Sequence, residues 1–555
     1  MDGNDTITVT EYLLRRLESL GVRHVFGVPG DYNLKLLDSI IDYPALEWVG
    51  TANELGASYA VDGYARITGF GALVTTFGVG ELSAINGVAG SYAERVPLVH
   101  LAVGPAQAME RTGALLHHTA GDGDYERFAR AHAEVTCAQA VLRPGNAGAE
   151  IDRVLTTALR ESRPGYLRLP ADVAAARIAA PTDPLPRTED VDTESLSAFL
   201  RAAEKRVAGA SSATVLADFL ADRFHARDEL AEFLAVSGFP VSTLSMGKTV
   251  IDEDNPQFVG VYSGRLSDPR TRIAVDEADL LIRVGVLLSD TTSGGFTQGF
   301  DLEAGIDIGP YSAAVDGKRF DGVPMRAALT GLTKRIGEVV ALPTSRVETA
   351  AVASPIERTD APLSQNDLWD MVAAAVRPWN TVIAEQGTSF FGMCTRRLPG
   401  GARFIAQPLW GSIGYTLPAL LGAQLADPSR RGLLLIGDGS AQLTIQELGT
   451  VARHGLTPVI VLVNNGGYTV ERAIHGRRAV YNDIAEWDWA AIPHALGATD
   501  ALVLRARTSA ELARALDEAA QATDRLVFVE VRTDMDDTPP LLTGFADGVG
   551  ARNSG

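Results

Sequence analysis

The amino-acid sequence predicts an α/β protein built from three domains with parallel-sheet cores. Short apolar runs typical of strands alternate with helical patterns along the 555 residues, and two proline-containing stretches divide this alternation into three blocks. An apolar fraction of 46% is ample for several large cores. We therefore expect domains at residues 1–185, 190–342 and 363–555.

The first block contains three clear strand candidates, at residues 22–26, 73–77 and 98–103. It ends in the proline-rich segment 180–186, where regular structure should stop. These features predict one α/β domain up to about residue 185.

The second block has its clearest strands at residues 214–216 and 280–284, and a linker containing Pro, Ser and Thr follows it at 343–362. No Gly-x-Gly-x-x-Gly fingerprint follows a strand in this block, so no sequence feature of the block indicates nucleotide binding. We expect its role to be structural.

The third block carries a strand, helix, strand unit with oxygen ligands at its ends. An apolar run at 433–436 stops at Asp438, a helix follows from near Ser440, and a second strand at 459–463 ends at Asn465. The two strands of such a unit run parallel, so Asp438 and Asn465 should emerge at one edge of the sheet, where ligands bind. Carboxylate and amide oxygens suit Mg²⁺, which completes its shell with phosphate oxygens. The implied ligand is a diphosphate.

Charge and cysteine content exclude several classes of partner. A net charge of −20 argues against binding to nucleic acid or to an anionic membrane. Cys137 and Cys394 are too few for a disulfide framework or a zinc cluster, and we expect them to be buried, reduced thiols. No export signal and no stretch of membrane-spanning length is visible, so we expect a cytoplasmic enzyme.

Several motifs now support a family resemblance that spans nearly the whole chain. The letters GDG at 437–439, followed after a helix by NN at 464–465, resemble the diphosphate motif of thiamine diphosphate enzymes. The neighbouring motifs resemble those of 2-oxo acid decarboxylases, namely FGVPGDYNLKLLD at 26–38, NELGASYAVDGYAR at 53–66, LLHHTAGDGD at 115–124, QPLWGSIGYTLPALLGA at 407–423 and NNGGYTVERAIHG at 464–476. The resemblance implies that the first and third blocks are similar folds, which bind the pyrimidine and the diphosphate and flank the middle domain.

The resemblance also implies how this chain would hold the cofactor. Glu54 would hydrogen-bond the aminopyrimidine nitrogen and so promote loss of the thiazolium proton. The Gly411 carbonyl would accept a hydrogen bond from the pyrimidine amino group, and Ile413 would wedge between the two rings. The Gly467 carbonyl would be the third metal ligand beside Asp438 and Asn465. The remaining expected cofactor contacts are Thr388, Gly439 and Ser440, the last reaching a phosphate from the helix start.

Two positions depart from the family pattern. Gly466 stands where the family has an acidic residue, which puts the stiffness of that loop in question. Gly56 replaces the usual Asn two residues after Glu54, and we expect it to loosen the entry into the helix.

Decarboxylation of a 2-oxo acid needs an electron sink, which the twenty side chains do not provide and a thiazolium does. By resemblance, Asp31 and His118 would handle protonation at the active carbon and aldehyde release, with His117 orienting them. Glu471 would lie against the substrate carboxylate and favour loss of neutral carbon dioxide.

Substrate size is suggested by an apolar position beside Glu471. Val470 occupies a place where pyruvate-preferring members tend to carry Ile, so the pocket should be wider. Phe390 and Phe391 would supply an apolar wall, and the C-terminal segment around Phe545 would close the cavity. We expect branched-chain or aromatic 2-oxo acids to be preferred.

The function expected is that of a lyase, which converts a 2-oxo acid to an aldehyde and carbon dioxide with thiamine diphosphate and Mg²⁺. The alternatives are a carboligase of the acetolactate synthase type, a pyruvate-preferring decarboxylase and a catalytically inactive subunit. The HHT and GYTVE motifs argue against the carboligase, and an inactive subunit should show damage at Glu54, Asp438 or Asn465. In the family the sites lie between the first domain of one subunit and the third of another, so we expect a homodimer or homotetramer.

Overall fold

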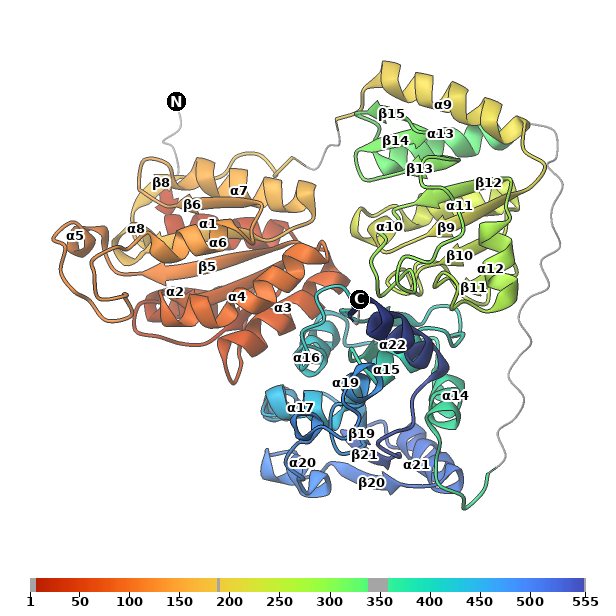
Figure 1. Ribbon diagram of the computed structural model, residues 1–555. Coiled ribbons are helices and arrows are strands. Elements are labelled where there is room, and N and C mark those ends of the chain that lie inside the picture. Colours follow the sequence, from red (N-terminus) through yellow and green to blue (C-terminus); the bar gives the residue numbers. More distant parts are fainter. Residues whose placement is uncertain (1–5, 187–189, 338–357, 554–555) are drawn as a thin grey trace.

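The computed structural model describes residues 6–186, 190–337 and 358–553, which form three domains (Figure 1). In Figure 1 the first domain is red to orange, the middle domain yellow to green and the third cyan to blue. Each is built on its own sheet with helices packed against it, which confirms the predicted three-domain α/β class. The predicted linker at 343–362 falls largely outside the described residues, and the exact domain boundaries stay predictions.

The first domain has a six-stranded, wholly parallel sheet in the order β3-β2-β4-β5-β7-β6. Its strands are β2 (His24–Gly27), β3 (Glu47–Gly50), β4 (Gly71–Thr76), β5 (Leu98–Gly104), β6 (Ala138–Val141) and β7 (Gly165–Pro170). Its helices are α1 (Val9–Ser19), α2 (Leu34–Ile41), α3 (Glu54–Thr68), α4 (Val79–Ala93), α5 (Gln107–Glu110), α6 (Arg127–Ala133), α7 (Ala147–Glu161) and α8 (Ala171–Ala174). Strands β1 (Thr6–Thr8) and β8 (Arg177–Ala179) form a short antiparallel pair, which connects the first and last segments of this domain.

The third domain repeats this topology. Its parallel sheet has the order β17-β16-β18-β19-β21-β20, so both sheets run second, first, third, fourth, sixth, fifth in chain order. The strands are β16 (Asn380–Ala384), β17 (Arg403–Ile405), β18 (Arg431–Gly437), β19 (Val459–Asn464), β20 (Leu502–Ala506) and β21 (Val527–Arg532). The helices are α14 (Gln365–Ala375), α15 (Thr388–Met393), α16 (Thr416–Ala426), α17 (Asp438–Thr444), α18 (Glu447–Arg453), α19 (Thr469–Ile474), α20 (Ile492–Ala495), α21 (Ser509–Gln521) and α22 (Pro540–Asn553), with 3₁₀ turns η1 (Val480–Asn482) and η2 (Trp489–Ala491). The shared order confirms that the outer domains are similar folds.

The middle domain has a mixed sheet in the order β11-β10-β9-β12-β13-β14-β15. Its first five strands along that order are parallel, and the last two add an antiparallel edge. The strands are β9 (Ala213–Ala217), β10 (Val241–Thr243), β11 (Phe258–Val261), β12 (Leu280–Val284), β13 (Ile306–Ile308), β14 (Ser312–Val315) and β15 (Lys318–Asp321). The helices are α9 (Thr193–Ala208), α10 (Leu220–Arg223), α11 (Arg227–Ser237), α12 (Pro269–Asp276) and α13 (Met325–Gly337).

The predicted strand, helix, strand unit is present with one difference. β18 and β19 pair in parallel, as expected. The helix between them is two short helices, α17 and α18, and α17 begins at Asp438 instead of near Ser440. Asp438 therefore lies in the first helical turn, where a carboxylate is favoured by the helix dipole.

Helices α3 and α16 join the first and third domains within one chain (Figure 1). A Cβ at Gly63 would collide with the Ala419 carbonyl, and one at Gly422 would collide with the Ala60 carbonyl. These two glycines therefore allow the helix backbones to touch, and an apolar core continues across the contact. The contact fixes the start of α3, at Glu54, relative to the turn that precedes α16.

None of the helices in the described ranges combines the length and the apolar character needed to cross a lipid bilayer.

Candidate cofactor and catalytic site

Asp438 lies at the carboxyl edge of the third sheet, where its carboxylate is almost fully buried. Its Oδ2 accepts hydrogen bonds from the backbone N–H groups of Asn465 (3.1 Å) and Gly466 (2.7 Å), and its Oδ1 accepts from Gly439 (2.7 Å). Burial raises the pKa of Asp438 to about 6, although these N–H groups favour the charged form. A cation facing the carboxylate would favour that form further.

Three oxygen atoms lie close together at this site, one each from Asp438, Asn465 and Gly467. The side-chain amide oxygen of Asn465 lies 3.0 Å from the Gly467 carbonyl oxygen and 3.2 Å from Asp438 Oδ1, with no proton to place between these acceptors. Ligands at 2.0–2.1 Å around an octahedral Mg²⁺ are about 2.9 Å from their neighbours, close to these separations. If the amide were turned over, its NH₂ group would donate to both oxygens instead. The donor set therefore fits a hard divalent cation.

The two glycines after Asn465 have backbone conformations suited to this site. Gly466 has φ +74°, and its N–H is held by Asp438, so the loop is anchored without the family's acidic side chain. A Cβ at Gly467, whose φ is +134°, would collide with the Asn482 carbonyl. A side chain at Gly467 would thus displace the carbonyl oxygen that faces Asn465.

A cavity of about 260 Å³ adjoins these oxygens. The expected site residues that line it are Thr388, Gly411, Ile413, Asp438, Gly439, Ser440, Asn465, Gly467, Val470 and Glu471. Every residue of its lining belongs to the third domain, between positions 385 and 471. Glu385, which sequence reasoning missed, lies in the same lining.

The expected aromatic wall lies behind this cavity. Phe390 and Phe391 are buried in a cluster with Leu542 of α22, and Val470 packs against the cluster. Phe545 stacks near Phe391 at 5.3 Å between ring centroids. The three aromatic rings therefore back Val470 and are not part of the cavity lining, so their effect on substrates stays a prediction.

The first domain brings Asp31, His117 and His118 together. His117 Nε2 lies 2.8 Å from Asp31 Oδ2, and the two imidazoles meet edge to face with centroids 4.6 Å apart. Tyr32, which we did not select from the sequence, stacks on His117 at 4.8 Å. These side chains are partly or largely exposed to solvent.

The start of α4 lies between Glu54 and His118. His118 has the left-handed value φ +65°, and its carbonyl occupies the place where a Cβ of Gly78 would stand. Two residues further on, a Cβ at Gly80 would lie 3.1 Å from Glu54 Oε1. Gly78 and Gly80 therefore leave room for the His118 carbonyl and the Glu54 carboxylate.

Glu81 holds the start of α4 in place by a hydrogen bond to Gly78. Its fully buried carboxylate accepts the Gly78 N–H at 2.7 Å and the Tyr166 hydroxyl at 2.8 Å. Burial raises the pKa of Glu81 to about 7. Sequence reasoning missed this residue, because Gly78 lacks the Ser or Thr side chain that marks a capping box in a sequence.

The expectation that Gly56 loosens the entry into α3 is wrong. Asn53 caps the helix by accepting the Gly56 N–H at 2.7 Å. The space beside Gly56 is filled by Glu447 of the third domain, whose Oε1 accepts the Ala52 N–H at 2.9 Å. The missing side chain thus admits a buried carboxylate that holds the segment before Glu54.

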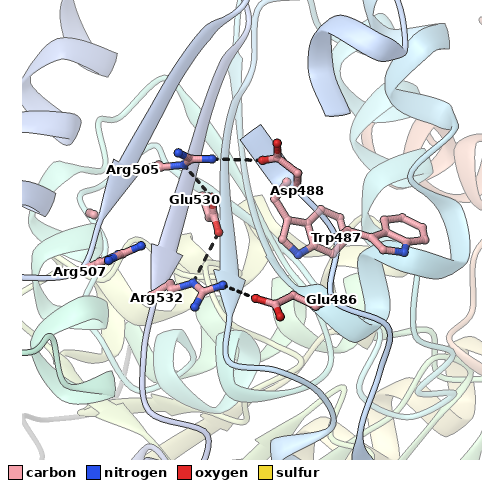
Figure 2. A pocket seen from close by; sticks show the side chains of 9 residues that line it. Glu486, Trp487, Asp488, Arg505, Arg507, Glu530 and Arg532 are labelled. Carbon is pink, nitrogen blue, oxygen red and sulfur yellow. Dashed lines mark hydrogen bonds and ion pairs between the residues drawn. The ribbon is translucent and has the colours of Figure 1, made fainter. Parts of the chain in front are cut away.

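Another hollow, of about 420 Å³, lies at the carboxyl ends of β20 and β21 (Figure 2). Arg505 pairs with Asp488 and Glu530, each at 3.1 Å, and Arg532 pairs with Glu486 at 3.0 Å. Because these charges largely satisfy one another, and none of the expected site residues lines the hollow, we do not assign the chemistry to it.

Comparisons with known proteins agree with this geometry. Residues 7–123, 200–330 and 388–531 match the models for the N-terminal TPP binding domain, the central domain and the C-terminal TPP binding domain of thiamine pyrophosphate enzymes. The chain is 51% identical over 544 residues to an alpha-keto-acid decarboxylase of Mycolicibacterium paratuberculosis, which covers 96% of this chain and 95% of that protein. It is 50% identical over 537 residues to an alpha-keto-acid decarboxylase of Mycobacterium tuberculosis, with 96% of each chain covered. These matches confirm thiamine diphosphate as the cofactor, and the chain belongs to the family of thiamine diphosphate-dependent 2-oxo acid decarboxylases.

Proposed function

We propose that this chain catalyses the non-oxidative decarboxylation of 2-oxo acids to the aldehyde one carbon shorter and carbon dioxide. The observation that carries the proposal is the simultaneous presence of a cavity lined by the expected metal and diphosphate residues and of the Asp31, His117 and His118 cluster. The names of the relatives support the same reaction. Free Cys137 and Cys394 are consistent with a cytoplasmic enzyme.

The cradle suggests how the cofactor is held. Asp438, Asn465 and the Gly467 carbonyl would bind Mg²⁺, which in turn would bind the diphosphate. Gly439 and Ser440 lie in the first turn of α17, so they would approach the phosphates. Thr388, the Gly411 carbonyl and Ile413 would contact the rings from the cavity wall.

Thiamine diphosphate supplies the electron sink, and the chain supplies positioning and proton transfer. Glu54 would hydrogen-bond the pyrimidine nitrogen. Glu471, at the cavity, would lie against the substrate carboxylate and disfavour its charged form as carbon dioxide leaves. Asp31 and His118 would deliver a proton to the carbon that becomes the aldehyde, with His117 held in place by Asp31.

A second copy of the chain would complete the site. Among the described residues, no hydrogen bond, ion pair or ring contact joins Glu54 or the Asp31 cluster to Glu471. Apolar side chains are exposed beside both halves, with Val79 55% and Leu82 41% exposed in the first domain and Trp410 41% and Leu443 43% exposed in the third. Such exposure marks interaction surfaces, which supports a homodimer or homotetramer.

The substrates we favour are branched-chain or aromatic 2-oxo acids. Val470 lines the cavity next to Glu471 and leaves more room than Ile would. One methylene in an apolar pocket is worth about 1 to 3 kcal/mol, so the preference should be graded.

The test is aldehyde formation from a panel of 2-oxo acids by the holoenzyme, with Val470→Ile measured beside it. We expect 4-methyl-2-oxopentanoate, phenylpyruvate or indolepyruvate to exceed pyruvate in kcat/KM, and Val470→Ile to penalise the larger acids. A wild-type enzyme that prefers pyruvate to all three would refute the substrate assignment. Acyloins as the main product would favour the carboligase alternative.

The shared site can be tested by mixing two inactive chains. Glu54→Gln and Glu471→Gln alter opposite halves, so a heterodimer of the two would contain one unaltered site. Co-expression should restore about a quarter of wild-type activity if chains pair at random in symmetric dimers. No recovery in verified heterodimers would place both halves of the site in one chain.

A further inference from the structure

Glu385 is a buried carboxylate in the cofactor cavity with no assigned role. It directly follows β16, is 2% exposed and lines the cavity with Thr388 and Ile413. None of the described lysine, arginine or histidine side chains forms an ion pair with it. Its burial must therefore be compensated by hydrogen bonds.

These hydrogen bonds come from the segment after Ile413. Oε2 of Glu385 accepts from the Thr416 hydroxyl at 2.6 Å, the Gly414 N–H at 3.2 Å and the Thr416 N–H at 3.4 Å. Oε1 accepts the Gln386 N–H at 3.1 Å. Burial raises the pKa of Glu385 to about 7, and all four donors oppose that rise by favouring the charged form.

The Glu385 carboxylate lies at the start of helix α16, where backbone N–H groups need acceptors. The first N–H groups of helix α16, which begins at Thr416, have no hydrogen-bond partners within the helix. Tyr415, the residue before the helix, does not cap them with its side chain. The Glu385 carboxylate accepts one of them and puts negative charge at the positive end of the helix.

Gly414 is held from both sides by this arrangement. Its N–H is bound by Glu385, and its carbonyl accepts the Thr444 hydroxyl at 2.7 Å. Gly414 has φ +88° and Gly411 has φ +67°, so two left-handed glycines bracket Ile413 in a tight turn. The position of Ile413 thus depends on a peptide group that Glu385 fixes.

We propose that Glu385 is a positioning residue, which holds the turn around Ile413 so that the side chain presses on the cofactor in the geometry needed for activation. The proposal rests on the proposed contact of Ile413 with the cofactor rings. A small displacement of a positioning group costs rate more than affinity, because the diphosphate stays anchored through the metal.

The experiment compares full-length Glu385→Ala, Glu385→Gln and wild-type enzyme with thiamine diphosphate and Mg²⁺. We measure the dissociation constant of the cofactor and, at saturating cofactor, the rate of proton exchange at its thiazolium carbon. Alanine should slow the exchange by at least about tenfold and change the dissociation constant by less than about threefold. Glutamine keeps an acceptor for Gly414 and Thr416, so it should recover most of the exchange rate.

Asp218→Ala is the matched control. Asp218 is also a buried carboxylate that accepts a backbone N–H, from Leu287 at 3.1 Å, but it lies in the middle domain and outside the cavity lining. Equal slowing in both alanine variants would overturn the proposal, since general destabilisation would then explain it. An exchange rate in Glu385→Ala within twofold of wild type would also overturn it.

A second variant keeps the test decisive if Glu385→Ala does not fold. Thr416→Val removes only the 2.6 Å hydroxyl bond, and it should slow the exchange by a smaller factor. Unchanged exchange in a folded Thr416→Val variant, together with an unfolded alanine variant, would leave Glu385 a stabilising residue only and contradict the proposal. Failure of the proposed function is a different result, because the wild-type enzyme would then form no aldehyde.

Discussion

The side-chain amide of Asn465 lies 3.2 Å from Oδ1 of Asp438, so an amide group and a carboxylate meet in a buried place. With its oxygen turned toward Asp438, the amide would offer a cation a ligand beside the carboxylate. Asp438 directly follows β18 and Asn465 directly follows β19, and these two strands are adjacent and parallel.

Replacement of Asp438, the proposed metal ligand, should strongly weaken cofactor binding. We expect Asp438→Ala to weaken thiamine diphosphate binding by at least about 100-fold, because the diphosphate is held through the cation. Isothermal titration with Mg²⁺ present measures this, and wild-type enzyme with a chelator should behave alike. Unchanged affinity in the variant and with chelator would contradict the metal assignment.

Replacement of Glu54 should affect activation of the cofactor and leave its affinity nearly unchanged. Glu54→Gln keeps the size of the side chain and removes the acid, so proton exchange at the thiazolium carbon should slow by about 10²–10⁴-fold. Exchange is measured by rapid quench in deuterated water. Wild-type exchange rates in the variant would assign activation to another group.

Glu471 and His118 should matter for turnover after the cofactor is bound. Glu471→Gln and His118→Ala should each bind thiamine diphosphate normally and lower kcat by about 10²–10⁴-fold, because each removes a group that handles a proton or the substrate carboxylate. Steady-state assays and product analysis check this. Near-normal kcat in both variants would exclude these two roles.

Gly78 should be intolerant of any side chain. A Cβ there would collide with the backbone carbonyl of His118, and Gly78 has φ +70°, so Gly78→Ala should displace His118 and lower kcat strongly. Gly121→Ala is the control, because Gly121 has φ +80° but no atom within 4 Å of its Cβ position. Equal kcat in the two variants would show that the contact with His118 does not matter.

Asp218 should make stability depend on pH. Burial raises its pKa from 3.8 to about 7 in the folded protein. Between pH 3.8 and about 7 the carboxyl group is therefore protonated in the folded state and ionised in the unfolded state. The free energy of unfolding decreases as the pH rises through this range, and the contribution of Asp218 is lost by about pH 7. Asn cannot ionise, so the Tm of Asp218→Asn relative to wild type should increase from pH 5 to pH 8. Exposed Asp228→Asn is the control, and parallel curves for Asp218→Asn and wild type would contradict the linkage.

The sequence by itself determined the fold class and much of the candidate site. Parallel strands joined by helices place their carboxyl ends at one edge, so the order of Asp438 and Asn465 along the chain was enough to bring them together. The pair His117 and His118 needed no long-range reasoning, and the motifs indicated the cofactor. These features are local, or depend only on the alternation of strands and helices.

Only the tertiary structure decided which groups support these residues. Glu447 fills the space beside Gly56, Glu81 holds Gly78 beneath His118, and Glu385 holds the turn after Ile413. In sequence each is an ordinary glutamate, which is exposed in most proteins. Whether a carboxylate is buried, and which N–H groups it meets, depends on elements that pack over it from distant parts of the chain, and local sequence does not encode that packing.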